Sequence, residues 1–160
     1  PDYRLHYIEE QEPLGTAGSL RILDGQFNQS FFVTNCDVIV RTDYFSLFEF
    51  HKNNNFDLTL VASGKQFIIQ YGICKLSPDG SLSHIVEKPK YDHLINTGLY
   101  VVKADVLKKI PKNKFYDITH LIDDIMKSGN KVGIFPIEDE SWMDVGQWSE
   151  YQKTLRIYDT

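Results

Sequence analysis

Apolar and polar positions follow two different periods along this chain, and the changes of period predict its elements. Short apolar or alternating runs predict strands at Arg4–Glu9, Ser30–Thr34, Leu58–Ala62, Tyr71–Leu76, Leu82–Glu87, Asn96–Val102 and Val132–Pro136. Helical spacing predicts helices over Thr16–Leu23, from Thr42 or Asp43 to Asn53, from Asp117 to Gly129, and over Gln147–Ile157.

The order of these elements predicts the fold class. Strand–helix–strand alternation favours an α/β, Rossmann-like, mixed and mostly parallel sheet with flanking helices. The middle differs, because the turn residues of Ser77–Ser81 lie between two strand patterns and predict a hairpin. The helix after Asp117 carries an apolar face that we expect in the core, formed by Ile118, Leu121, Ile122, Ile125 and Met126.

Composition limits the classes of protein to which this chain can belong. A chain of 160 residues with 42% hydrophobic residues fits one domain with a substantial core, here residues 1–160. A net charge of −5 gives no basic footprint for nucleic acid. The apolar runs are too short for a membrane span, and we expect a cytoplasmic protein. Cys36 and Cys74 lack metal-site spacing, so we expect reduced, partly buried thiols.

Two acidic positions are the first candidates for chemistry. Asp37 follows a predicted strand, where open α/β sheets bind ligands, although a cap or turn would also explain it. Asp144 lies between apolar residues in Trp142–Gly146, so we expect a metal or a hydrogen-bond donor beside it, with a helix cap as the alternative. Together, the two carboxylates suit Mg²⁺ and phosphate oxygens.

Three further motifs have both a structural and a functional interpretation. The small residues of Leu14–Gly18 form an ordinary tight turn or admit a ring or phosphate to the backbone. Glu87–Pro89 is either a solvated strand end or a site in which one of Glu87 and Lys88 binds hydroxyls and the other a phosphate. Asn96–Tyr100 is a turn before a core strand, or it places an amide and Gly98 against a ligand.

In this order, the motifs resemble the sugar-1-phosphate nucleotidylyltransferase family over about Tyr3 to Leu155. Leu14–Gly18 and the Trp-x-Asp-x-Gly ending are most similar to the mannose-1-phosphate guanylyltransferase-like branch. The resemblance implies the nucleotide-diphospho-sugar transferase fold and a role in nucleotide-sugar biosynthesis. The implied reaction joins a sugar-1-phosphate to the α-phosphate of a nucleoside triphosphate and releases pyrophosphate.

The resemblance also implies residue roles. Asp37 and Asp144 would hold Mg²⁺, and Lys88 would bind the sugar phosphate. The remaining residues would bind substrate: Gly15, Thr16 and Ala17 the nucleoside, and Gly72, Glu87, Asn96 and Gly98 the sugar. These roles agree with the chemistry, since two anions meet only when a cation and a lysine offset their repulsion.

One family feature is absent from this sequence. The family begins with a strand and a Gly-Gly-x-Gly-x-Arg loop that grips the triphosphate, and no such pattern occurs here. We therefore expect the later part of a catalytic domain, incomplete at its N-terminus and inactive or nearly so alone. Its sheet should have unpaired strand edges. A second chain or an exchanged segment would then fill the place of the central strand.

Two alternatives remain open at this point. A nucleotide-sugar-dependent glycosyltransferase would also place an acid such as Asp37 after a strand. A non-catalytic sugar-nucleotide-binding module would keep the sugar and metal residues without turnover. The sequence defines neither the sugar nor the base.

Overall fold

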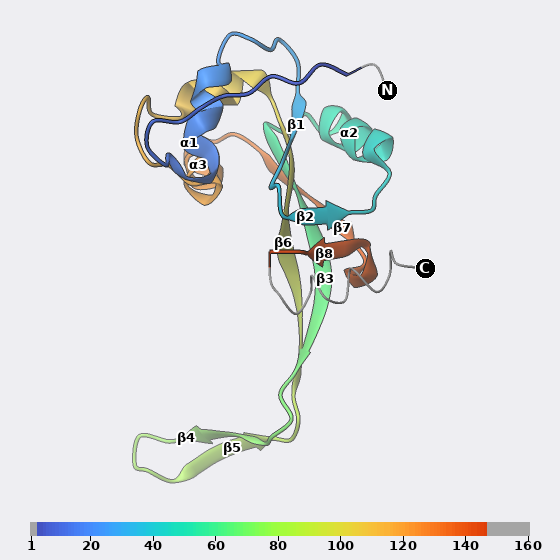
Figure 1. The fold of residues 1–160 in the computed structure, drawn as a ribbon. Helices are drawn as coiled ribbons and strands as arrows, with labels where there is room; N and C mark the ends of the chain where they lie inside the picture. The colour runs from blue at the N-terminus through green and yellow to red at the C-terminus, as the bar shows by residue number, and fades with distance from the viewer. Residues whose placement is uncertain (1–2, 147–160) are drawn as a thin grey trace. The chain divides into compact units, whose positions relative to one another are not determined.

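The computed structural model describes residues 3–146 (Figure 1). Its α-helices are α1 (Gly15–Gly18), α2 (Tyr44–Asn53) and α3 (Ile118–Lys127), and its 3-10 helices are η1 (Ser19–Leu23), η2 (Ala104–Lys109) and η3 (Asp139–Ser141). The strands are β1 (Phe31–Thr34), β2 (Val38–Val40), β3 (Leu58–Ile68), β4 (Ile73–Leu76), β5 (Leu82–Val86), β6 (Lys90–Val102), β7 (Val132–Ile137) and β8 (Trp142–Asp144).

These elements form one larger sheet and two strand pairs. The larger sheet has the order β1-β6-β3-β7, and β2 pairs with β8 and β4 with β5. The predicted α/β class with a mixed sheet and flanking helices is confirmed. The registers of β1–β6, β2–β8 and β4–β5 are antiparallel, so such pairing contributes more than strand–helix alternation suggests. Within residues 3–146, β1 is an edge strand with β6 as its one neighbour.

The described residues group into two compact units. The first contains the chain up to Cys36, together with Asp43–Leu60 and Gly98–Phe135. The second contains Asp37–Thr42, Val61–Thr97 and the chain from Pro136 onward. Strands β3, β6 and β7 each begin in one unit and end in the other, so both units depend on the same three strands.

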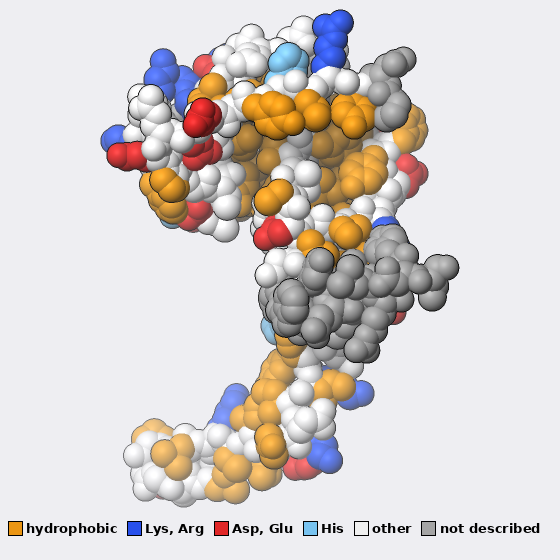
Figure 2. Space-filling model, viewed as in Figure 1, with side chains coloured by type: hydrophobic (Ala, Val, Ile, Leu, Met, Phe, Trp, Pro, Cys, Tyr) orange, Lys and Arg blue, Asp and Glu red, His pale blue; other side chains and the backbone are white. Residues whose placement is uncertain are grey.

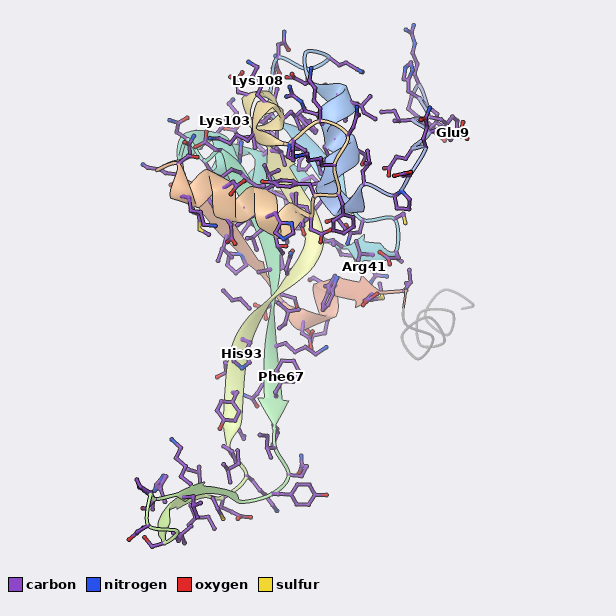
Figure 3. The ribbon with its side chains drawn as sticks, turned by 90° about the vertical axis from the view of Figure 1, so that its left-hand side faces the viewer. Glu9, Arg41, Phe67, His93, Lys103 and Lys108 are labelled. Carbon is purple, nitrogen blue, oxygen red and sulfur yellow. The ribbon has the colours of Figure 1, made fainter. Side chains whose placement is uncertain are left out.

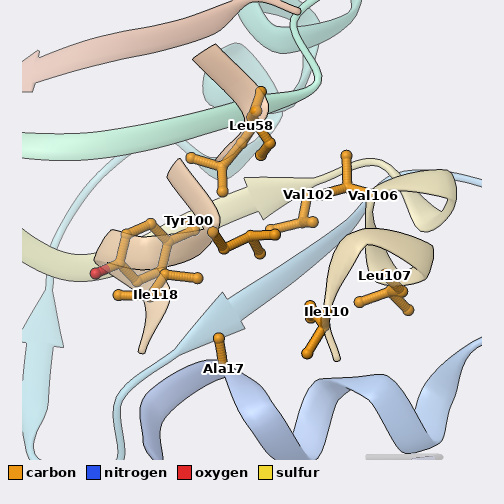
Figure 4. Packing of buried hydrophobic residues seen from close by; sticks show 10 residues of the cluster. Ala17, Leu58, Tyr100, Val102, Val106, Leu107, Ile110 and Ile118 are labelled. Carbon is orange, nitrogen blue, oxygen red and sulfur yellow. The ribbon is translucent and has the colours of Figure 1, made fainter. Parts of the chain in front are cut away.

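The core of the first unit lies where α1, η2 and α3 meet the sheet. Its buried members are shown in Figure 4 and include Ala17, Leu58, Tyr100, Val102, Val106, Leu107, Ile110, Ile118, Leu121 and Ile125. Burying one such aliphatic side chain contributes about 1.5–3 kcal/mol. The predicted apolar face of α3 is confirmed at its centre, but Met126 is 52% exposed and lies outside the core.

Both ends of α3 are capped by local sequence. The Asp117 side chain accepts from the backbone of the third helical residue, and the His120 side chain accepts from Asp117 N, which completes a capping box. At the other end, Gly129 has φ +75° and its N–H donates to Met126 O, while Asn130 N donates to Ile125 O. This pair of bonds is the Schellman motif, and glycine allows its left-handed residue.

Helix α2 begins at a side-chain cap and carries a buried histidine. Asp43 Oδ1 accepts hydrogen bonds from Phe45 N and Ser46 N. His51 is fully buried, and its ring nitrogens lie 3.0 Å from Ser30 Oγ and 2.9 Å from Thr59 Oγ1. Burial, with a smaller effect of Lys103, lowers the pKa of His51, so the neutral imidazole belongs to the folded state.

The second unit exposes apolar residues on its hairpin. Strands β4 and β5 are joined by the predicted turn, in which Gly80 N donates to Ser77 O. Leu76 is 77% exposed and Leu82 is 61% exposed, and Figure 2 shows hydrophobic side chains along this hairpin. A two-stranded hairpin has no inner layer to cover such side chains, and it is marginal in water when isolated.

Several sequence predictions were wrong. Arg4–Glu9 is not a strand, because its alternating apolar side chains find no partner strand and Tyr7 is 90% exposed. The predicted helix over Thr16–Leu23 is instead α1 followed by the 3-10 helix η1, and Leu14, which precedes α1, provides no side-chain cap. Both cysteines are exposed rather than partly buried.

Strand β1 alternates between half-buried and exposed residues. The predicted helix over Gln147–Ile157 lies outside the described residues. None of the helices in residues 3–146 has the length and apolar character needed to cross a membrane.

Candidate functional site

The two predicted metal ligands lie at one end of the β2–β8 pair in the second unit. Val38 is opposite Asp144 in the antiparallel register, so Asp37 directly precedes the residue that faces Asp144. Val145 N donates to Asp37 O at 2.9 Å and closes this end of the pair. Residues 107 positions apart in the sequence are thus held together by backbone pairing.

Gly146 leaves room between the two carboxylates. A Cβ at this position would lie 2.7 Å from Asp37 Oδ2 and 3.2 Å from Asp144 Oδ1. Both carboxylates therefore border one small volume that a side chain at residue 146 would fill. Gly146 N also donates to Asp144 Oδ1 at 3.0 Å, which supplies the donor expected beside this half-buried acid.

The two aspartates are a suitable pair for a hard divalent cation. Mg²⁺ in proteins is bound by one or two carboxylates, with waters and substrate phosphates completing its octahedron. Within residues 3–146, no group of three or more His, Cys, Asp or Glu side chains is placed to hold a metal. The donor set therefore fits a cation shared with a phosphate substrate better than one enclosed by protein.

A cluster beside Asp144 was not predicted from the sequence. Lys65 Nζ lies 5.8 Å from the Trp142 ring centroid and 4.0 Å from Asp139 Oδ1. Trp142 precedes Asp144 by two residues on β8, so the two side chains share a strand face. Lys65 has no motif around it, and only the pairing of β3 with its neighbours brings it here.

The predicted sugar-binding residues Gly72 and Glu87 meet at the base of the hairpin. A Cβ at Gly72 would lie 3.0 Å from Glu87 Oε2, so the absence of a side chain makes room for this carboxylate. Lys88 follows with φ +43°, a left-handed conformation that is uncommon for a non-glycine residue. Strain of this kind is often kept at ligand sites.

The hairpin group and the aspartate pair lie apart within the second unit. In Figure 1, the β4–β5 hairpin and the β2–β8 pair are at opposite ends of this unit, with β3 and β6 running between them. Figure 3 labels Phe67 on β3 and His93 on β6 along that stretch, where their ring centroids are 5.9 Å apart. Asn96, also on β6, is exposed.

The predicted nucleoside residues have packing roles in the first unit. Thr16 Oγ1 accepts from Ile118 N at 2.9 Å, and Asp117 Oδ1 accepts from Thr16 N at 3.2 Å. A Cβ at Gly15 would lie 2.8 Å from the same Asp117 oxygen, and Ala17 is fully buried in the core. The small residues therefore let α1 approach the start of α3.

Gly98 likewise makes room for a protein group. Its φ is +84°, and a Cβ there would lie 2.7 Å from Asn35 Nδ2 and 3.3 Å from Asn35 Cβ. Asn35 N donates to Gly98 O at 2.9 Å. The glycine thus fixes how Asn35, at the end of β1, approaches β6.

Comparison with known proteins gives consistent matches. The family model described as "Nucleotidyl transferase" matches residues 2–159. A probable mannose-1-phosphate guanylyltransferase 3 of Oryza sativa subsp. japonica is 33% identical over 94% of this chain and 43% of its own length. A mannose-1-phosphate guanyltransferase of Aspergillus fumigatus is 31% identical over 98% of this chain and 44% of its own length. The chain thus spans less than half the length of these relatives.

Solved structures match over most of the chain. The structure of HddC from Yersinia pseudotuberculosis has a TM-score of 0.62 and 25% identity, covering 93% of this chain and 64% of that one. A putative glucose-1-phosphate thymidylyltransferase from Bacillus anthracis has a TM-score of 0.67 at 18% identity, covering 94% and 63% of the two chains. The second likeness concerns the fold alone.

Proposed function

Because this chain belongs to the nucleotidyl transferase family, we propose that it contributes to nucleotidyl transfer from a nucleoside triphosphate to a sugar-1-phosphate. A phosphate oxygen of the sugar-1-phosphate forms a bond to the α-phosphorus. The bond from that phosphorus to the bridging oxygen breaks, and pyrophosphate leaves with the electron pair. The observation that carries the proposal is the pair Asp37 and Asp144 around the volume left by Gly146.

Asp37 and Asp144 are the proposed ligands of Mg²⁺. When bound, the ion would offset negative charge on the phosphate oxygens and orient them. Strand pairing between β2 and β8 fixes the spacing of the two carboxylates before any ligand arrives. The bond from Gly146 N holds Asp144 Oδ1 in place, which limits the reorganisation that binding requires.

The hairpin base is the proposed site for the sugar phosphate. Lys88 offers a cation for its phosphate, and Glu87 accepts hydrogen bonds from sugar hydroxyls. Gly72 keeps the Glu87 carboxylate close to the backbone, and Asn96 and Gly98 stay proposed sugar-binding residues. The attacking phosphate oxygen is already ionised near neutral pH, so no protein group has to remove a proton.

For one reaction, the hairpin base has to approach the aspartate pair within the second unit. We propose that the sugar phosphate draws Lys88 toward the cation-binding end of β2–β8. If so, in a chimera that supplies the missing triphosphate loop, Lys88→Gln raises KM for the sugar-1-phosphate more than KM for the nucleotide. An equal rise in both constants would assign Lys88 a general electrostatic role instead.

Gly15, Thr16 and Ala17 are proposed to line the nucleoside pocket, with the exposed Thr16 facing the ligand, because the N–H groups of Thr16 and Ala17 already donate to Asp117 Oδ1 and Tyr116 O. Its base is proposed to be guanine and the sugar mannose, from the names of the relatives reported above. Competition among the four common nucleoside triphosphates tests the base, and competition among hexose-1-phosphates tests the sugar. Turnover that is equal for all triphosphates would contradict the guanine assignment.

A complete enzyme needs groups that bind the triphosphate. The Gly-Gly-x-Gly-x-Arg pattern that would supply them does not occur in these 160 residues. We propose that the chain alone catalyses little or no turnover. We also propose that a further strand pairs with β1, which is an edge strand within residues 3–146. A second copy or an exchanged segment would pair there, since Phe32 on this strand is 40% exposed. We also propose that residues 1–160 form a single domain and that the protein is cytoplasmic.

The test is a chimera in which the Gly-rich strand and loop of a guanylyltransferase relative precede this chain. With Mg²⁺, GTP and mannose-1-phosphate, the chimera should release pyrophosphate and the chain alone should not. Asp144→Asn in the chimera should abolish release, and Asp123→Asn, an exposed acid on α3, should leave it unchanged. Full activity of the Asp144 variant would overturn the assignment.

A sugar-nucleotide-binding module is the second candidate, favoured by the missing triphosphate pattern. Calorimetry with GDP-mannose distinguishes it: binding by a chimera that never releases pyrophosphate would favour the module. Transfer of a sugar from a nucleotide-sugar to an acceptor would instead favour a glycosyltransferase.

A further inference from the structure

A cavity in the first unit combines positive charge with apolar walls. It has a volume of about 190 Å³ and is lined by Leu14, Gly18, Arg21, Ile22, Lys112 and Asn113. Among these six lining residues two are cations and none is acidic. None of the residues assigned above to nucleotidyl transfer lines this Arg21 cavity, so it is a separate feature.

Arg21 is held in place at the wall of the cavity. Its side chain is 17% exposed, and Nη1 lies 3.0 Å from Asp24 Oδ2 and donates to Leu107 O at 3.0 Å. Its Nε is buried and finds no hydrogen-bond partner within the described part of the chain. Because this nitrogen has almost no surface within reach of a water molecule, it offers no contact to a ligand in the cavity, and only the rest of the guanidinium can do so.

The backbone around the cavity is fixed by close packing. A Cβ at Gly18 would lie 2.9 Å from Lys114 O, so glycine lets the 112–114 segment close against α1. Asn113 has φ +52°, a left-handed turn residue that directs the chain past the cavity. Lys112 is exposed, and its flexible ammonium can therefore move to a bound group.

An acidic groove borders the cavity. The groove, of about 490 Å³, is lined by Glu9, Glu10, Gln11 and Glu12 and shares Leu14, Ile22 and Asn113 with the cavity. Glu10 Oε2 accepts from Leu14 N at 2.9 Å, which holds this segment beside the shared wall. Figure 3 labels Glu9 on the acidic segment and Lys108 on η2 of the same unit. The acids disfavour a large anion that extends into the groove.

We propose that the Arg21 cavity binds a small oxyanion group, a phosphate or a carboxylate, whose ligand places its apolar part against Leu14 and Ile22. An arginine donor and a lysine ammonium are the usual partners of such groups. With a volume of about 190 Å³, the cavity has room for such an ion together with a few carbons of its ligand.

The test titrates inorganic phosphate into the 160-residue chain at constant ionic strength, with chloride as the reference and acetate as the carboxylate probe. The readout is the amide chemical shifts of Gly18 and Asn113. We expect saturable shifts with phosphate or acetate but not with chloride. Saturation by phosphate alone assigns a phosphate site, and saturation by acetate alone assigns a carboxylate site.

Variants separate the cavity from general charge. Lys112→Gln should weaken binding about tenfold, the effect of losing one charge-assisted hydrogen bond. Lys127→Gln removes the same charge from an exposed position on α3 outside the cavity and should have no effect. Arg21→Lys keeps the charge and removes the planar guanidinium, and it should weaken binding further if the variant folds. Shifts that fail to saturate, or equal losses in the two lysine variants, would overturn the proposal.

Discussion

Replacing Gly98 by alanine tests how closely this glycine packs against Asn35. Its φ is +84°, and the added Cβ would meet Asn35 Nδ2 at 2.7 Å, Asn35 Cγ at 3.0 Å and Asn35 Cβ at 3.3 Å. Asn35 cannot simply swing aside. Its own Cβ is among the close atoms, and its N–H is bonded to Gly98 O.

The expected cost has two sources. A left-handed conformation costs a residue with a Cβ about 1–2 kcal/mol. Inserting a methyl group into a packed site costs about 1–3 kcal/mol more. We therefore expect Gly98→Ala to lower the free energy of unfolding by about 2–5 kcal/mol, a large fraction of the total stability of a small domain.

Denaturant unfolding measures this cost, and Gly25 supplies the matched control. Gly25 has φ +83° but no atom within 4 Å of an added Cβ, so Gly25→Ala should show the conformational cost alone. Adding Asn35→Ala to Gly98→Ala should recover part of the difference, since it removes the two nearest atoms, Nδ2 and Cγ, and leaves only Cβ at 3.3 Å. Equal costs at Gly98 and Gly25, or no recovery in the double variant, would refute this reasoning.

Other predictions follow from single contacts. Because burial lowers the pKa of His51 below its ordinary value of 6.5, the unfolded chain binds a proton more readily as the pH falls through 6.5. Unfolding free energies at about pH 7.5 and about pH 5.5 should show lower stability at the acidic pH, and His51→Gln should reduce that difference; an unchanged difference would contradict the assignment. Asp117→Ala should destabilise the chain by about 1–2 kcal/mol through loss of the α3 cap, as measured by thermal or denaturant unfolding, and a change below about 0.3 kcal/mol would count against the capping box. Cys36 and Cys74 should both react with a thiol reagent in the native chain, and protection of either one would contradict its exposure.

Local signals in the sequence were sufficient for several elements. The apolar period after Asp117, an acid at the cap and a glycine at the end predict α3, and each acts within a few residues. The turn around Gly80 predicts the β4–β5 hairpin for the same reason. The Arg4–Glu9 prediction failed because alternation describes a residue pattern, whereas a strand also needs a neighbour to pair with.

The candidate site depends on contacts that no local pattern contains. Asp37 and Asp144 were predicted as a pair from their residue type and a family resemblance, and strand pairing explains how they meet. The small residues of Leu14–Gly18 suited either a ligand or close packing, and only the position of Asp117 shows what Gly15 contacts. Lys65, beside Trp142, had no signal because its neighbours come from distant segments.

The most direct test of the account is divalent-cation binding at Asp37 and Asp144. Mn²⁺ titrated into the 160-residue chain and followed by its electron paramagnetic resonance signal should bind saturably and be displaced by Mg²⁺. Gly146→Ala should weaken this binding at least about tenfold, because a Cβ 2.7 Å from Asp37 Oδ2 forces a shift larger than the ±0.2 Å that metal–ligand distances tolerate. The double variant Asp37→Asn with Asp144→Asn should lose the site, and Asp123→Asn should keep it. Unchanged Mn²⁺ affinity in the double variant would contradict the claim that these two strands form the metal end of a nucleotidyl transfer site.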